Sequence, residues 1–138
     1  PAAARQAPAR PAAPPVHQAF TVRINQDGSV TFTATDLVDP AAATRELNKA
    51  GIAGKVEDSS TGKQCPTMWR DSDLVRGQKA ALWHGNTVTI RPTDYPAGGG
   101  VLVLVLHTVD QRTRKAVTVV VELAYRELAR IPSCLNLG

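Results

Sequence analysis

The sequence is poor in cysteine, in aromatic residues and in long apolar runs, and two of these shortages exclude a class of protein. Two cysteines in 138 residues are too few for a disulfide-rich mini-protein or for a four-cysteine zinc site. The longest wholly apolar run covers residues 101–106, whereas a membrane-spanning helix needs roughly 20 apolar residues. The hydrophobic content of 43% is still sufficient for one globular core in a chain of this length.

The first residues differ in composition from the rest of the chain. Of the first 19 positions, 13 are Ala or Pro, and no large apolar residue precedes Val16. Such a stretch buries too little surface to offset the entropy lost on ordering, and its prolines disfavour a helix. We therefore predict a disordered tether over residues 1–18 and a single domain over residues 19–138. Since the chain starts without Met and without a signal-peptide pattern, we expect any targeting or membrane segment upstream of Pro1.

The net charge gives little support for nucleic-acid binding. The formal charge of the whole chain is +4, but setting aside Arg5 and Arg10 of the tether leaves 14 basic residues against 12 acidic ones. The remaining basic residues are scattered, apart from a cluster of Arg112, Arg114 and Lys115 in a predicted turn. We therefore expect no nucleic-acid partner, because such binding depends on concentrated positive charge.

The first part of the domain has the pattern of a β-hairpin. Residues 20–25 and 30–35 alternate strictly between apolar and polar side chains, and Asp27-Gly28 lies between them. Asp-Gly supplies the positive φ angles that a tight turn between antiparallel strands requires. The threonine-rich face of the second strand is typical of a sheet with solvent on one side.

A helix is predicted to follow this hairpin. Asp39 can accept hydrogen bonds from the free N–H groups of a first turn, and Pro40 costs no hydrogen bond at the first helical position. Gly51 is typical of the residue that follows the last helical turn. The sequence therefore predicts a helix from Pro40 to Ala50 with a narrow apolar stripe.

The remaining strands complete an α+β domain. They are predicted over residues 52–57, 87–91, 101–106 and 116–125. The strand at 101–106 is apolar on both faces, which indicates a central strand that is covered on both sides. Residues 65–86 have no clear period, and we expect irregular structure there with one short helical turn after Ser72. The order β-β-α-β-β-β-β predicts a mostly antiparallel sheet of about five to six strands with one helix packed across it.

Cys65 and Cys134 are separated by 69 residues and neither lies in a C-x-x-C motif. Two interpretations remain: a structural disulfide, or two unrelated buried thiols. We favour a Cys65–Cys134 disulfide, because both cysteines flank proline-containing, non-repetitive segments that need an anchor. Such a disulfide would indicate an oxidising, extracytoplasmic compartment.

Residues with metal-binding or catalytic chemistry do not form a recognisable motif. His17, His84 and His107 share no spacing that places ligands on one face of an element, so each is expected to be a structural or surface histidine. There is no Gly-x-Ser-x-Gly motif around a nucleophile. We therefore expect no cofactor, no metal, no catalytic residues and no enzyme activity.

Two further motifs have a plain structural interpretation. Asp71 and Asp73 form a close carboxylate pair, which we interpret as charges on a loop because nothing indicates a pocket that would perturb their pKa values. Gly98–Gly100 could be taken for a phosphate-binding loop, but a strand follows it and not a helix. We expect a flexible inter-strand loop there.

Half of the aromatic residues lie in the least regular part of the chain. Trp69, Trp83 and Tyr95 are accompanied there by Met68 and Arg70. One interpretation is a small additional core beneath a long loop. The functional interpretation is a partner-binding surface, because aromatic anchors on loops contribute much of the energy of interfaces.

Several segments together resemble a family of actinobacterial envelope proteins. The segments are FTVRINQDGSVTF at 20–32, DLVDP at 36–40, LNKAGI at 47–52, TIRP at 89–92 and YPAG at 95–98, and the resemblance covers most of residues 18–135. The two cysteines also match. The resemblance implies a single-pass protein with an Ala/Pro-rich stalk and this domain outside the membrane. Some such proteins are similar to anti-sigma factors, and no catalytic or binding residue is implied.

These observations lead to an expectation about function. We expect a non-enzymatic extracytoplasmic domain on a stalk that binds or senses another protein or an envelope component, with a membrane contact only through an upstream segment. One alternative is a secreted protease inhibitor that presents Cys65–Arg70 as an exposed loop. Another is a hydrolase with an unrecognised site.

Overall fold

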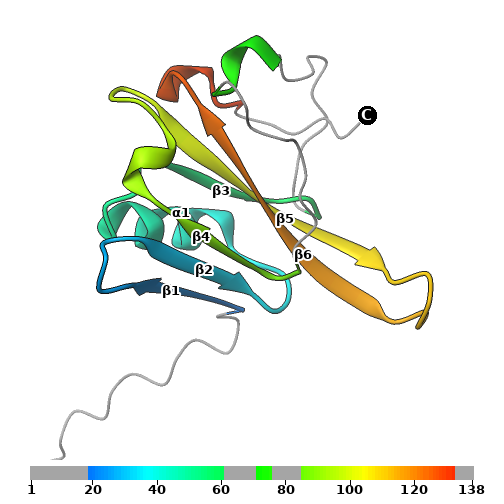
Figure 1. Cartoon of the computed structure of the whole chain (residues 1–138). Helices are drawn as coiled ribbons and strands as arrows, with labels where there is room; N and C mark the ends of the chain where they lie inside the picture. The colour runs from blue at the N-terminus through cyan, green and yellow to red at the C-terminus, as the bar shows by residue number, and fades with distance from the viewer. Residues whose placement is uncertain (1–18, 61–70, 76–84, 133–138) are drawn as a thin grey trace, which may run out of the picture.

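The computed structural model describes residues 19–60, 71–75 and 85–132. This part of the chain is an α+β unit with one α-helix and six strands in two sheets of three (Figure 1). One sheet has the order β1-β2-β4, with β1 at Phe20–Ile24, β2 at Val30–Ala34 and β4 at Thr87–Ile90. The other has the order β3-β5-β6, with β3 at Gly54–Asp58, β5 at Gly100–Val109 and β6 at Ala116–Tyr125.

The predicted N-terminal hairpin is confirmed. β1 and β2 are antiparallel, with Phe20 opposite Ala34 and Ile24 opposite Val30. Gly28 in the turn has a φ of 86°, which a glycine adopts without steric cost. The alternation of side chains turns Val30, Phe32 and Ala34 into the core and leaves the threonines of β2 on the other face.

The six strands form two sheets, where the sequence predicted one. β3 pairs in parallel with β5, and the connection between these two strands passes through β4 of the first sheet. Helix α1 (Pro40–Lys49) connects β2 of the first sheet to β3 of the second. The other three strand pairs are antiparallel, as predicted. One backbone hydrogen bond of 2.9 Å, from the Val120 N–H to the Gly85 carbonyl, links β6 to the segment that leads into β4.

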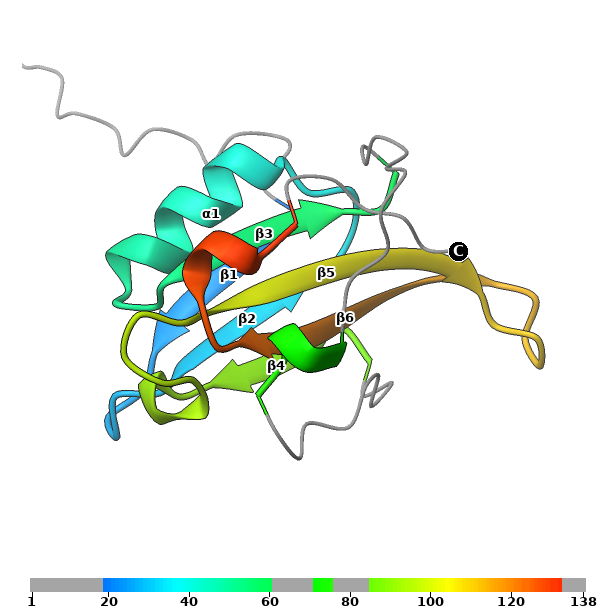
Figure 2. The same ribbon diagram turned by 90° about the horizontal axis from the view of Figure 1, so that it is seen from above.

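Helix α1 forms as its sequence predicts. The Asp39 carboxylate accepts hydrogen bonds from the N–H groups of Ala41 and Ala42, and Gly51 follows the helix with a φ of 96°. The helix lies along β3 (Figure 2). Ala43 and Leu47 are its buried residues.

The polar side of α1 also satisfies the free edge of β3. The Thr44 hydroxyl accepts a hydrogen bond of 2.9 Å from the Val56 N–H, and the Asn48 amide donates one of 3.2 Å to the Gly54 carbonyl. An exposed strand edge with unpaired backbone groups would invite pairing with another chain. The helix therefore blocks that edge.

β5 separates two groups of buried apolar side chains, as its two-sided hydrophobicity predicts. Val101, Val103 and Val105 face the first sheet and α1, where they join Phe32 and Leu47. On the opposite face, the buried side chains are Leu74, Leu102, Leu104, Val119, Val121, Leu123 and Tyr125. The same strand therefore contributes to both cores.

Two of the three consecutive glycines at the start of β5, Gly99 and Gly100, are tightly packed, where the sequence predicted a flexible loop. Gly99 and Gly100 are buried. A Cβ atom at Gly99 would lie 2.4 Å from the Tyr125 carbonyl oxygen, and one at Gly100 would lie 2.9 Å from the Ala53 carbonyl oxygen. Gly100 is already the first residue of β5. These glycines permit close packing of backbones, and the sequence pattern did not distinguish that role from mobility.

We predict that Gly54→Ala destabilises the domain far more than Gly28→Ala. Both glycines have positive φ angles, but a Cβ at Gly54 would lie 2.0 Å from the Val101 carbonyl oxygen, whereas one at Gly28 meets no atom within 4 Å. We expect Gly28→Ala to cost about 1 kcal/mol of unfolding free energy and Gly54→Ala about 3 kcal/mol or more. Urea unfolding of both variants measures this, and equal losses would contradict the described β3–β5 pairing.

Candidate functional site

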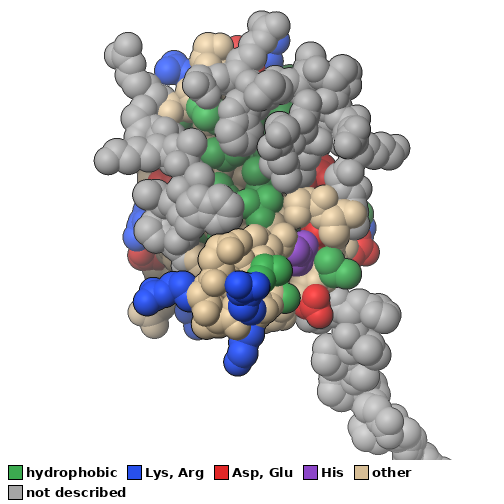
Figure 3. Space-filling model, turned by 90° about the vertical axis from the view of Figure 1, so that its right-hand side faces the viewer, with side chains coloured by type: hydrophobic (Ala, Val, Ile, Leu, Met, Phe, Trp, Pro, Cys, Tyr) green, Lys and Arg blue, Asp and Glu red, His purple; other side chains and the backbone are tan. Residues whose placement is uncertain are grey.

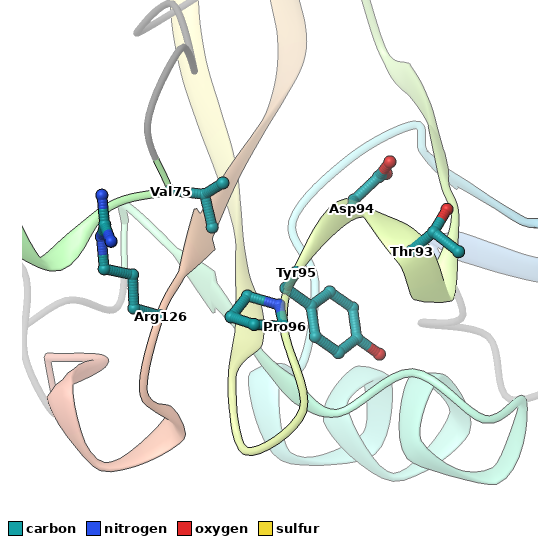
Figure 4. Close-up of a pocket in the computed structure, with 6 residues that line it drawn as sticks. All are labelled: Val75, Thr93, Asp94, Tyr95, Pro96 and Arg126. Atoms are coloured by element: carbon teal, nitrogen blue, oxygen red, sulfur yellow. The ribbon is translucent and has the colours of Figure 1, made fainter.

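An open pocket of about 390 Å³ lies where β6 ends and β5 begins. Its residues come from three separate segments of the chain. The first segment is the end of η3, a 3₁₀ helix at Pro92–Asp94, with the loop that follows it. The second is Val75, which follows Leu74 and its isolated β-bridge to Tyr125, and the third is Arg126, which follows β6. The lining residues are Val75, Thr93, Asp94, Tyr95, Pro96 and Arg126. Figure 4 shows Val75 and Arg126 on one side of Pro96, and Thr93 and Asp94 on the other.

Two polar side chains of the pocket, Tyr95 and Arg126, are held by hydrogen bonds to the backbone. The Tyr95 hydroxyl accepts a bond of 3.0 Å from the Ala53 N–H, which fixes the ring against the segment leading into β3. The Arg126 Nε donates to the Leu74 carbonyl at 2.9 Å. A partner would therefore meet side chains that already have a defined position.

Asp94 connects the pocket to a partly buried carboxyl group. Its Oδ2 accepts a hydrogen bond of 2.9 Å from the Arg91 N–H, and its carboxylate is also hydrogen-bonded to Glu122 of β6. Glu122 extends from β6 between Val120 and Ala124, two residues of the first core. The pocket thus has an ionisable pair behind one wall.

Burial, followed by the negative charge of Asp94, raises the pKa of Glu122 to about 7. The positive charge of Arg91 acts in the opposite direction, and the hydrogen bond with Asp94 adds to the rise. A carboxyl group with a pKa of about 7 changes its protonation state within the physiological pH range. Glu122 itself does not line the pocket, so its proton would affect a bound partner only through Asp94.

A second polar cluster lies at the other end of β5. Asp58 is the last residue of β3, one residue beyond the strand predicted over residues 52–57, and it is fully buried. Its Oδ2 lies 2.8 Å from the Nε2 of His107 and accepts a bond of 2.9 Å from the Val38 N–H, while its Oδ1 accepts from the Ser60 N–H and hydroxyl. The Thr118 hydroxyl lies 3.4 Å from the Nδ1 of His107.

This cluster joins four parts of the fold, namely β3, β5, β6 and the segment before α1 that contains Val38. Burial alone would raise the pKa of Asp58, but the hydrogen bonds from Ser60, His107 and the Val38 backbone outweigh that effect and lower it. An ordered acid, imidazole and hydroxyl also occur in hydrolases, but the pocket around Tyr95 is lined by none of these residues. We interpret the cluster as structural, which agrees with the expectation for His107.

Of the residues proposed from sequence as a binding surface, the structure describes Tyr95, which lines the pocket. Met68, Trp69, Arg70 and Trp83 lie outside the described residues, so their part in the surface stays a prediction. The same holds for a disulfide between the two cysteines and for the loop of the protease-inhibitor alternative.

Sequence reasoning missed the charged residues of the pocket and of its wall. Glu122 was the one detectable signal, because it is the single charged residue on a face of β6 that also carries Val120 and Ala124. Asp94 and Arg126 had no local signal, since each looks like an ordinary loop residue until the fold brings the two segments together.

Within the described ranges, no group of three or more His, Cys, Asp or Glu side chains could hold a metal ion. In the same part of the chain, no helix is both long and apolar enough to cross a membrane. Comparisons of the chain with protein-family models, with curated proteins and with solved structures gave no match.

We predict that Asp58→Asn lowers the unfolding free energy by about 2–3 kcal/mol at pH 7, because an NH₂ group replaces an oxygen that accepts charge-assisted hydrogen bonds. Asp27→Asn is the matched control: Asp27 also accepts from a serine two residues later, but at an exposed turn. We expect this substitution to have little effect on the unfolding free energy, as is usual at exposed positions. Urea unfolding compares the two, and equal costs would show that Asp58 is no more important than a surface aspartate.

We also predict that the stability of the domain falls as the pH rises from about 4.5 to about 7. The folded state binds the Glu122 proton more tightly than the unfolded state does, so deprotonation favours unfolding in this window. Glu122→Gln cannot ionise, and we expect it to be more stable than the wild type by roughly 2–3 kcal/mol at pH 8. Urea unfolding at several pH values measures this.

The control for this prediction is Glu127→Gln, at an exposed position paired with Arg130. It should keep the pH dependence of the wild type. A wild-type stability that is constant or increases between pH 4.5 and 7 would contradict the environment described for Glu122.

Proposed function

We propose that this domain is a non-enzymatic, extracytoplasmic binding module, and that the pocket around Tyr95 is its contact site for a protein or envelope component. The observation that carries the proposal is the pocket itself, whose walls come from three segments and in which the Tyr95, Asp94 and Arg126 side chains are held by hydrogen bonds to the backbone. Tyr95 is also one of the five residues that sequence reasoning had placed in a binding surface.

The shape and chemistry of the pocket support a macromolecular partner. Sites for small molecules usually enclose most of the ligand, whereas this pocket is wide open to solvent. Val75, Pro96 and the Tyr95 ring provide apolar surface, and Asp94 and Arg126 provide opposite charges. An apolar side chain flanked by charged groups on a partner protein would complement this arrangement.

The location rests on features of the sequence. The favoured disulfide between Cys65 and Cys134, the Ala/Pro-rich tether and the resemblance to envelope proteins all support an oxidising compartment. The absence of a catalytic motif in the sequence supports binding over hydrolysis.

We predict that a photo-crosslinking amino acid in place of Pro96 captures one major partner in cells that express the full gene. Thr93→Arg adds bulk and charge to the pocket wall at an exposed position, and should reduce the crosslinked product at least about tenfold because it excludes the anchoring side chain. Thr89→Arg makes the same change at an exposed position on β4 outside the pocket.

In this experiment the Thr89→Arg variant should crosslink like the wild type. If Thr93→Arg leaves the crosslinked product unchanged, or if a crosslinker placed at Thr89 captures the same product equally well, the pocket is not the contact site.

A further inference from the structure

The β5–β6 hairpin continues beyond the sheet that supports it. β3 ends at Asp58, which lies opposite Val105, whereas β5 and β6 stay paired as far as Val109 and Ala116. The last part of this hairpin projects from the rest of the domain in both ribbon views (Figures 1 and 2). We refer to residues 106–119 as the arm.

The arm is anchored at its base. A two-stranded hairpin is only marginally stable in water on its own. Here the His107 side chain on β5 is bonded to the buried Asp58 carboxylate at 2.8 Å and lies next to the Thr118 hydroxyl of β6. This cluster ties both strands of the arm to the end of β3.

The tip of the arm has a defined backbone. The Asp110 carboxylate accepts hydrogen bonds from the N–H groups of Arg112 at 2.7 Å and Thr113 at 3.3 Å, and the Asp110 carbonyl accepts one from the Arg114 N–H at 2.7 Å. Arg114 has a φ of 61°, in the left-handed region. The one acidic group at the tip is therefore used to shape the turn.

Three exposed cations are left at this tip, namely Arg112, Arg114 and Lys115. None of them forms an ion pair with another residue in the described part of the chain. Lys and Arg side chains gather on the end of the molecule toward which the arm points (Figure 3). Val109, beside them, is 49% exposed.

We infer that the tip of the arm contacts an anionic phospholipid surface. A single small anion needs convergent donors, but the N–H groups of Arg112, Thr113 and Lys115 are already bonded within the turn. A stable protein interface uses about 20–30 residues on each side, and the tip spans only residues 110–115. A flat anionic surface needs no enclosing shape, because each cation near it is attracted independently.

The inference is tested with the full chain and vesicles that contain either phosphatidylcholine alone or about one third phosphatidylglycerol, in low salt where charges are weakly screened. The arm variant is Arg112→Gln, Arg114→Asn and Lys115→Gln, with Asn chosen because it tolerates a positive φ. The control variant is Arg45→Gln, Lys49→Gln and Arg130→Gln, which removes the same charge from exposed positions elsewhere. Circular dichroism checks that both variants are folded.

We expect the wild type and the control variant to sediment with the phosphatidylglycerol vesicles and not with phosphatidylcholine alone, and added salt to release them. The arm variant should bind at least about tenfold more weakly, since three independent attractions are lost. If the wild type does not prefer the anionic vesicles, or if the arm and control variants lose binding equally, the inference is wrong.

Discussion

β5 has apolar side chains on both faces, so a folded state must exclude water from both sides of one strand at once. The first sheet and α1 cover the face with Val101, Val103 and Val105. Apolar side chains of β6 and Leu74 pack against those on the other face. Because β3 must lie directly beside β5 to complete the sheet, its first residue has to be a glycine, and α1 has to block its outer edge.

Both surfaces proposed for contact lie at the ends of the hairpin that β5 begins. The pocket is formed where the chain enters β5 and leaves β6, and the arm is formed at the turn between them. Strands of this length extend about 30 Å. The β5–β6 hairpin therefore carries the pocket at one end and the cationic tip at the other, which suits a domain that contacts a partner protein and an anionic lipid surface together.

Local patterns predicted the elements well, and failed where distant segments meet. The β1–β2 hairpin, the ends of α1 and the two-sided burial of β5 followed from residue order alone. The division into two sheets did not, because the parallel partner of β3 is more than 40 residues away. The burial of Asp58 was not predicted for a similar reason: it depends on His107 and Val38, which no local pattern connects to it.

We expect β5 to be the most stable element of the described domain, and its outer end to be a separate arm of lower stability. Hydrogen–deuterium exchange of the backbone amides tests this directly. Amides of Val101–Val105 should exchange the slowest in the described domain, through global unfolding, while those of Leu106–Val109 should exchange faster through local opening. If the β1–β2 hairpin proves to be protected longer than Val101–Val105, or if protection along β5 is uniform to Val109, the account is wrong.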